Sequence, residues 1–154
     1  MRWSGQSIKA YVEAREYIDT ALIPLVPFDL LEESEDVVAK GEYVQLLADG
    51  IEKQFTGRMM LLPPYTYLQN EPVSESGLKL NDWEAHLKQA GFQHIIYLTC
   101  DASWREKNTG DGVEIVWVPS ISLTSMEPKQ MKNVVQQQIN QTVPLITKKW
   151  SHQS

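Results

Sequence analysis

The chain is poor in cysteine and histidine, which limits the chemistry that it can perform. Cys100 is its only cysteine, so no disulfide can form within the chain, and a lone thiol suits a reducing compartment. Of its three histidines, His86 and His94 have no partner at the spacing that metal ligands need, and His152 lies in the last residues. The sequence therefore predicts a cytoplasmic protein with no histidine- or cysteine-based metal site and no cofactor.

Long apolar runs and clustered bases are also missing. No stretch approaches the roughly 20 apolar residues of a membrane span, and charged residues interrupt the first thirty positions, so we expect neither a secretory leader nor membrane contact. Lysine and arginine number 14 against 20 acidic residues, and the net charge of −6 argues against binding to nucleic acid. Only the segment 126–154 is basic, which fits either a solvated helix or contact with an acidic partner.

Standard catalytic and phosphate-binding motifs are absent as well. The eight glycines form no P-loop, and Gly110-Asp111-Gly112 lacks the third glycine of a dinucleotide fingerprint. This glycine segment also precedes a predicted strand, whereas the fingerprint follows one. The nucleophile elbow G-x-S-x-G does not occur. These absences favour a protein that is not an enzyme.

What the sequence does contain is an alternation of apolar runs and amphipathic segments. Apolar runs predict four strands, and helical periodicity predicts four helices, the last of which Pro144 should kink or end. Alternation of this kind is typical of a mainly parallel sheet covered on both faces. We therefore predict a three-layer α/β/α sandwich with a four-stranded, mainly parallel sheet, the orientation of its last strand left open. The expected strands are 20–26, 58–62, 94–100 and 113–118, and the expected helices are 7–18, 34–57, 81–91 and one from about 125.

The expected domain is 1–149, with 150–154 as a frayed tail, and the segment 65–79 is expected to be a long loop. Asn81 is expected to cap the third helix, with Glu84 completing a capping box.

Candidate binding residues follow the predicted strands, because ligands of open α/β sheets bind beyond the carboxyl ends of the strands. Aromatic rings in these connections either stack on a ligand or pack the loops down. A cysteine beside an aspartate is better explained as a buried, inert thiol than as a nucleophile, since the neighbouring charge raises its pKa. The predicted ligand-binding residues are Asp29, Tyr65, Tyr67, Cys100, Asp101 and Trp104.

Two resemblances to known families follow from longer stretches of sequence. The opening Met-Arg-Trp and the run Tyr-Ile-Asp-Thr-Ala-Leu-Ile-Pro-Leu-Val-Pro over 17–27 resemble the YpiF-like family of spore-forming bacteria, a family of unknown function. The layout over residues 20–104 is remotely similar to creatininase-type amidohydrolases: Leu22-Ile23-Pro24, then Leu61-Leu62-Pro63-Pro64, then a helix ending in Gly91-Phe92 before a strand.

The departures from the amidohydrolase pattern concern its metal ligands. Residues 27–30 do not show the family's Glu-Gln-His-Gly motif, and Cys100-Asp101-Ala102-Ser103 stands where Gly-His-Gly-Gly is expected. Only Asp101 could replace the metal-binding histidine. The resemblance thus implies a shared architecture in which the two-metal site is lost.

Two functions from different classes remain after these exclusions. The leading hypothesis is a non-catalytic domain that binds a protein or a small molecule at the carboxyl-end rim of the sheet. The alternative is a divergent metal-dependent hydrolase with a carboxylate-rich site built from Asp29, Asp101 and Glu32. A scaffolding protein that forms a stable oligomer is a third possibility, and the sequence leaves the oligomeric state undetermined.

Overall fold

The computed structural model describes residues 1–31 and 34–151, and residues 32–33 and 152–154 are not described. Its centre is a sheet of five strands, of which every pairing is parallel. The last strand is therefore parallel to its neighbour. The strands are β1 (Thr20–Phe28), β2 (Met59–Leu61), β3 (Tyr65–Leu68), β4 (His94–Thr99) and β5 (Val113–Trp117), in the order β2-β1-β4-β5 with β3 also on β1.

The long central strand β1 is paired along one side by two short strands in succession. β2 pairs with its first residues, up to Leu22 opposite Leu61, and β3 pairs with its last residues, from Leu25 opposite Tyr65. Pro63-Pro64 separates β2 from β3, because proline cannot donate to a ladder. The predicted four-stranded sheet thus lacks one strand, β3, which lies within the segment expected to be a loop.

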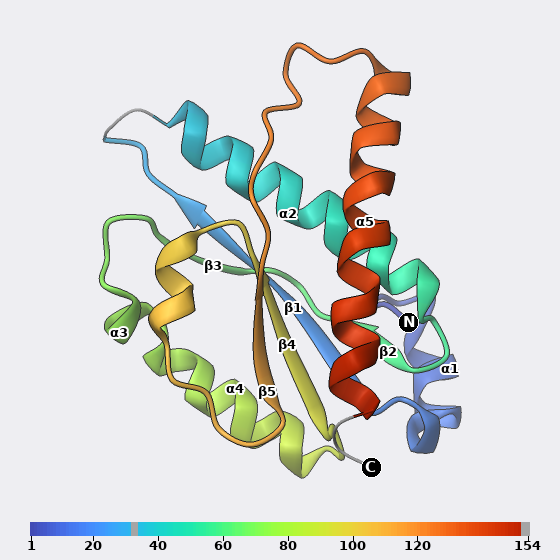
Figure 1. Ribbon diagram of the computed structural model, residues 1–154. Helices are drawn as coiled ribbons and strands as arrows, with labels where there is room; N and C mark the ends of the chain where they lie inside the picture. Colours follow the sequence, from blue (N-terminus) through green and yellow to red (C-terminus); the bar gives the residue numbers. More distant parts are fainter. Residues whose placement is uncertain (32–33, 152–154) are drawn as a thin grey trace.

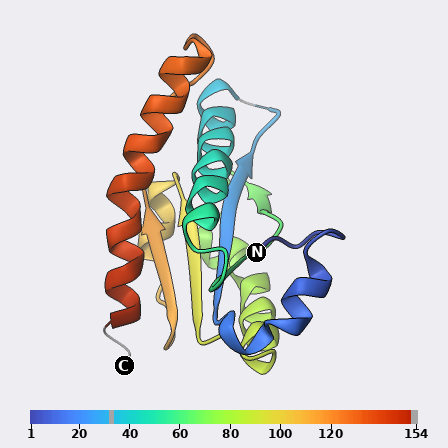
Figure 2. The ribbon, with the colours of Figure 1, turned by 90° about the vertical axis from the view of Figure 1, so that its right-hand side faces the viewer.

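Helices cover both faces of this sheet, as the sequence predicts. Figures 1 and 2 show α2 and α5 side by side on one face, with α4 and α1 on the other. The molecule is therefore a three-layer α/β/α sandwich. The helices are α1 (Ile8–Glu13), α2 (Glu35–Gln54), α3 (Val73–Ser76), α4 (Leu78–Gln89) and α5 (Pro128–Ser151), with 3-10 turns η1 (Arg15–Tyr17) and η2 (Ala102–Glu106).

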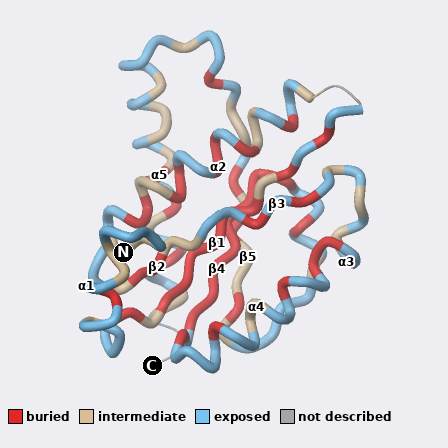
Figure 3. Tube along the Cα trace, turned by 180° about the vertical axis from the view of Figure 1, so that it is seen from behind, coloured by how far each residue is buried: buried red, intermediate tan, exposed pale blue. Residues whose placement is uncertain are grey.

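Two hydrophobic cores fill the spaces between the layers. Alternate residues of β1 point to opposite faces, so that Ile23 packs with α4 while Leu22 packs with α2. Figure 3 shows the resulting band of buried residues along the strands. α2 approaches β1 closely at Gly41, where an added Cβ would lie 3.0 Å from Val26 Cγ1. The sheet-facing side of this helix is formed by its buried small and apolar residues, Val37, Gly41, Val44, Ala48 and Ile51.

α4 starts three residues earlier than the sequence predicts. The short helix α3 leads through Gly77 directly into Leu78, so Asn81 lies inside the helix and the predicted capping box does not form. Gly91, the predicted end of this helix, is confirmed: its φ of 102° is in the left-handed region, where glycine is favoured.

α5 continues through Pro144 to Ser151, so of the two outcomes expected at this proline, a kink or an end, the end is wrong. The helix continues because its core-facing side chains extend past the proline to the buried Ile146 and the partly buried Trp150. The indole Nε1 of Trp150 donates a 2.8 Å hydrogen bond to Thr20 Oγ1, which docks the end of the helix on the start of β1. Within residues 1–31 and 34–151, no helix combines the length and apolarity needed to cross a bilayer.

Candidate functional site

The structure brings four of the six predicted site residues together. Tyr65 and Tyr67 point from β3 to the α4 side of the sheet, where they meet Trp104 of η2. Asp101 precedes η2 and accepts a hydrogen bond from Tyr67. The group therefore joins the carboxyl ends of β3 and β4, the edge at which the sequence predicts a site.

Asp101 is the centre of this group, and its carboxylate is saturated with hydrogen bonds. Oδ2 accepts from the Tyr67 hydroxyl at 2.7 Å and from Gln69 Nε2 at 3.2 Å. Oδ1 accepts from the backbone N–H of Ser103 at 3.1 Å and from its hydroxyl at 2.7 Å. A carboxylate has about four acceptor positions, so the four bonds occupy all of them and leave none for a metal ion.

These bonds also keep Asp101 ionised. Burial alone would raise the pKa of this carboxyl, but the hydrogen bonds from Tyr67 and Ser103 outweigh it and hold the pKa below its usual value. The Tyr67 hydroxyl shows the opposite shift: its pKa is raised by burial and by its bond to Asp101. Tyr67 thus stays a neutral donor, and Asp101 stays a charged acceptor that caps η2.

The three aromatic rings support the loops around Asp101. Tyr67 meets Trp104 edge-on at 5.1 Å between ring centroids and stacks with Tyr65 at 6.5 Å. Tyr65 contacts Trp83 of α4 edge-on at 5.3 Å, and its hydroxyl donates to the backbone oxygen of Ser76. Because all three rings are buried, they hold β3, α3 and η2 together beneath the surface.

Cys100 and Asp29 lie apart from this group. Cys100 is buried in the core on the α2 and α5 side, and burial raises the pKa of its thiol to about 12, only partly offset by Lys40. The Asp29 carboxylate, after the end of β1, accepts a 2.9 Å hydrogen bond from the N–H of Leu31. Glu32, the third carboxylate of the hydrolase hypothesis, lies outside the described residues.

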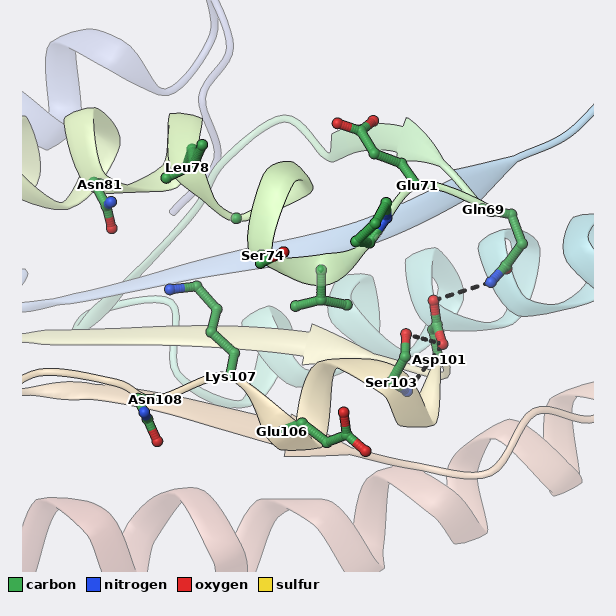
Figure 4. Close-up of a pocket in the computed structure, with 13 residues that line it drawn as sticks. Gln69, Glu71, Ser74, Leu78, Asn81, Asp101, Ser103, Glu106, Lys107 and Asn108 are labelled. Atoms are coloured by element: carbon green, nitrogen blue, oxygen red, sulfur yellow. Dashed lines mark hydrogen bonds between the residues drawn. The ribbon is translucent and has the colours of Figure 1, made fainter.

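A cleft of about 670 Å³, lined by both polar and apolar residues, opens over Asp101, between the α3–α4 junction and η2 (Figure 4). The Lys107 side chain rises from the end of η2 toward that junction and passes Gly77, where an added Cβ would lie 2.9 Å from Lys107 Cε. The same Cβ would lie 2.9 Å from the backbone oxygen of Val73, so the α3 turn, more than the flexible lysine, requires glycine at position 77. The cleft is lined by Gln69, Glu71, Pro72, Val73, Ser74, Gly77, Leu78, Asn81, Asp101, Ser103, Glu106, Lys107 and Asn108.

The cleft offers hydrogen-bonding groups and charges of both signs. It contains three carboxylates, one of them saturated, and one ammonium group, so its net charge is negative. Its lining includes no histidine or cysteine that could serve as a base or nucleophile. In the part of the chain that the structure describes, no three histidine, cysteine or acidic side chains gather to hold a metal ion. The arrangement can therefore bind and orient a polar molecule.

The sequence predicts only Asp101 among the residues that line this cleft. Ser74, Asn81 and Lys107 come from an expected loop, an expected helix cap and a polar connection, and none of them has a motif that marks it. Their common site depends on where α3 and η2 fold over the sheet edge, which no local pattern indicates.

Comparison with known proteins identifies relatives but no solved structure. A family model described as "Protein of unknown function (DUF2487)" matches residues 9–150. The uncharacterized protein YpiF of Bacillus subtilis (strain 168) is 32% identical over 151 residues, which cover 98% of this chain and 99% of that protein. No solved structure matches the chain. The resemblance to the YpiF-like family is thus confirmed, and the resemblance to creatininase-type amidohydrolases stays a prediction.

Proposed function

The chain belongs to the DUF2487 family of proteins of unknown function, and from its own geometry we propose that it is a non-catalytic binding domain. Its ligand is a small polar molecule held in the cleft between the α3–α4 junction and η2. We place the domain in the cytoplasm, where a single unpaired thiol such as Cys100 is stable.

One observation supports this proposal above the others. The only carboxylate in the cleft that the sequence marks for chemistry, Asp101, has its four acceptor positions filled by Tyr67, Gln69 and Ser103. A general base needs a free lone pair, and a metal ligand needs one as well. Asp101 therefore lines the binding site as a fixed charge and takes no part in proton transfer or metal binding.

The charges of the lining select the class of ligand. Glu71 and Glu106 contribute carboxylates besides Asp101, and Lys107 is the one ammonium group in the cleft. An anion such as a phosphate would be repelled by this balance, whereas a neutral or cationic molecule with several hydrogen-bonding groups would be attracted. Amines, amides and zwitterionic amino-acid-like compounds meet these requirements.

The proposal is tested by thermal unfolding in the presence of a panel of amines, amides, amino acids, sugars and phosphates. Binding to the folded state raises the free energy of unfolding by about 2.7 kcal/mol at a hundredfold excess over the dissociation constant. We expect a shift from a cationic or neutral compound, and we expect Asn81→Ala, at the wall of the cleft, to abolish it.

Asn133→Ala is the matched control, because Asn133 is also an exposed asparagine on a helix but lies on α5, away from the cleft. It should leave the shift unchanged. The proposal is wrong if phosphates alone stabilise the protein, if no compound does, or if the protein converts a bound compound to product.

A further inference from the structure

β5 forms an open edge of the sheet. It is the last strand in the order β2-β1-β4-β5, and among the described residues it pairs with β4 alone. Figure 2 shows it as the outermost strand, beside α5. The β2 side of the sheet is different, because the segment before α1 extends it: the N–H of Trp3 donates to the carbonyl oxygen of Leu61 at 3.2 Å. An open edge presents backbone groups to which a further strand can pair.

The backbone groups that β5 turns away from β4 are those of Ile115 and Trp117. In a parallel pair, alternate residues of a strand bond to the same neighbour. The carbonyl oxygen of Gly112 accepts a 2.7 Å hydrogen bond from the N–H of Ile95 in β4, so the even-numbered residues of this strand face β4 and the odd-numbered ones face outward. In the described part of the chain, nothing bonds to the N–H and C=O groups of Ile115 and Trp117. These groups are therefore available, at strand spacing, to another backbone.

A groove of about 380 Å³ follows this edge, between β5 and the connection that leads into it from η2. The side chain of Ile115 packs on the α4 side of the sheet, and Trp117 points the same way because it lies two residues further on. The Arg105 guanidinium lies over the Trp117 ring, 5.0 Å from its centroid. The groove is lined by Arg105, Lys107, Thr109, Glu114, Ile115 and Trp117.

The charge that this groove presents to a ligand is positive. Its one acid, Glu114, is paired with Lys149 of α5 at 2.9 Å. Of its two bases, Lys107 turns its side chain toward the cleft on the other side (Figure 4), so Arg105 is the base that remains over the groove. No described carboxylate lies within ion-pair distance of Arg105. Asp111, in the turn before β5, is outside the lining.

We propose that an extended acidic segment of another protein adds to β5 as a sixth strand. Its backbone pairs with the outward groups of Ile115 and Trp117, and an acidic side chain on the η2 side lies against Arg105. Strand addition of this kind takes its affinity from main-chain hydrogen bonds and its specificity from alternate side chains.

A second copy of the chain fits this edge less well. Two copies that pair through β5 are related by a two-fold axis, which brings their α5 helices together on one face of the joined sheet. α5 contains four lysines and no acidic residue, so the two helices would repel each other. The lysines are Lys129, Lys132, Lys148 and Lys149.

The test uses two short synthetic peptides, capped at both ends, in which valine alternates with glutamate or with lysine. Binding to the full chain is followed by NMR at low salt, together with amide hydrogen exchange. We expect the glutamate peptide to bind at least about tenfold more tightly than the lysine peptide and to weaken as salt screens the charges. It should slow exchange of the Ile115 and Trp117 amides and leave Glu114 and Val116, which already face β4, unchanged.

Two N-methylated forms of the glutamate peptide test whether its backbone is what pairs. Methyl groups on the valine nitrogens block one edge of the peptide, and methyl groups on the glutamate nitrogens block the other. Only one edge can face β5, so one form should lose binding and the other should keep it. Equal behaviour of the two forms would contradict strand addition.

Arg105→Gln tests the charge. It should weaken binding of the glutamate peptide about three- to fivefold, the effect of one exposed ion pair. Arg15→Gln is the matched control, because Arg15 is also exposed and lies over an aromatic ring, that of Tyr11 at 5.4 Å. It should leave binding unchanged.

Several outcomes would overturn the proposal. Equal affinity for the glutamate and lysine peptides would show that the edge does not select an acidic segment. Protection of Thr66 in β3 in place of Ile115 would move strand addition to the other side of the sheet. A dimer in sedimentation, with the Ile115 amide protected before any peptide is added, would assign the edge to a second copy.

Discussion

At the scale of single residues, the chemistry of Asp101 follows from its hydrogen bonds more than from its position. A carboxylate at the carboxyl end of a parallel strand is a reasonable candidate for catalysis, and the sequence supports no finer distinction. The structure shows the group buried and accepting bonds from Tyr67, Gln69 and Ser103. These donors turn a potential base into a fixed charge that stabilises the turn after β4.

Replacement of this charge has a pH-dependent effect on stability. Asp101→Asn should lower the free energy of unfolding by about 1–3 kcal/mol at neutral pH, because buried donors lose a charged acceptor. The folded pKa lies below the ordinary value of 3.8, so the contribution is complete above that value and is lost as the pH falls through the lower folded pKa. Urea unfolding of both proteins between neutral pH and strong acid measures this difference.

Asp111→Asn is the control, since Asp111 is an exposed aspartate in the same connection between β4 and β5. It should change stability by less than about 0.5 kcal/mol. A loss in Asp101→Asn that stays constant down to strongly acidic pH would contradict the assignment of a stabilising ionised carboxylate.

At the scale of elements, the connection into β5 depends on one glycine. Gly112 has a φ of 77°, and an added Cβ would lie 2.5 Å from the backbone oxygen of Gln93. Its own carbonyl accepts a 2.7 Å hydrogen bond from the N–H of Ile95 at the start of β4. Position 112 therefore requires a conformation that only glycine adopts easily.

Gly112→Ala should lower the free energy of unfolding by about 1–3 kcal/mol, because both the backbone conformation and the contact with Gln93 oppose a side chain. Gly110→Ala provides a matched control two residues away, since Gly110 has no atom within 4 Å of an added Cβ and no positive φ. Equal stability of the two variants in thermal or urea unfolding would show that Gly112 is not required by its conformation.

Element by element, four of the five strands were predictable from their apolar runs, and only β3 was missed. The runs 20–26, 58–62, 94–100 and 113–118 correspond to β1, β2, β4 and β5. The signal is clearest for β1 and β4, because strands at the centre of a covered sheet are buried on both faces and need apolar residues on both. β3 was missed because its four residues alternate between buried tyrosines and exposed positions, directly after two prolines. Its pairing with β1 is a tertiary contact that no local pattern reveals.

The candidate site was also predictable only in part. The edge of the sheet and Asp101 follow from strand direction alone. The remaining walls of the cleft are contributed by the segments 69–81 and 103–108, which meet only because the aromatic contacts of Tyr65, Tyr67 and Trp104 fold them together.

At the scale of the whole molecule, the end of α5 ties together parts of the chain that are far apart in sequence. Trp150 donates a hydrogen bond to Thr20, packs edge-on against Phe55 at 4.8 Å, and lies under the Arg58 guanidinium at 4.0 Å from the ring centroid. Arg58 in turn makes two hydrogen bonds to Asp19, at 3.0 and 3.2 Å. This cluster closes the amino-end edge of the sheet, opposite the proposed binding cleft.

Trp150→Ala should lower the free energy of unfolding by about 2–4 kcal/mol, near the range for a buried aromatic side chain. Trp150→Phe keeps the ring but loses the donor to Thr20, so we expect about 1 kcal/mol. Leu145→Ala, on an exposed part of α5, should have little effect. Calorimetry measures all three, and unchanged stability of Trp150→Ala would mean that α5 is held by its earlier residues alone.

The measurement that tests the binding-domain account most directly is an NMR amide titration with the compound that most stabilises the protein. The account predicts that the shifted amides belong to the cleft, at Ser74, Gly77, Asn81, Ser103 and Lys107, and that the compound remains chemically unchanged. Shifts centred elsewhere, or conversion of the compound during the titration, would contradict it.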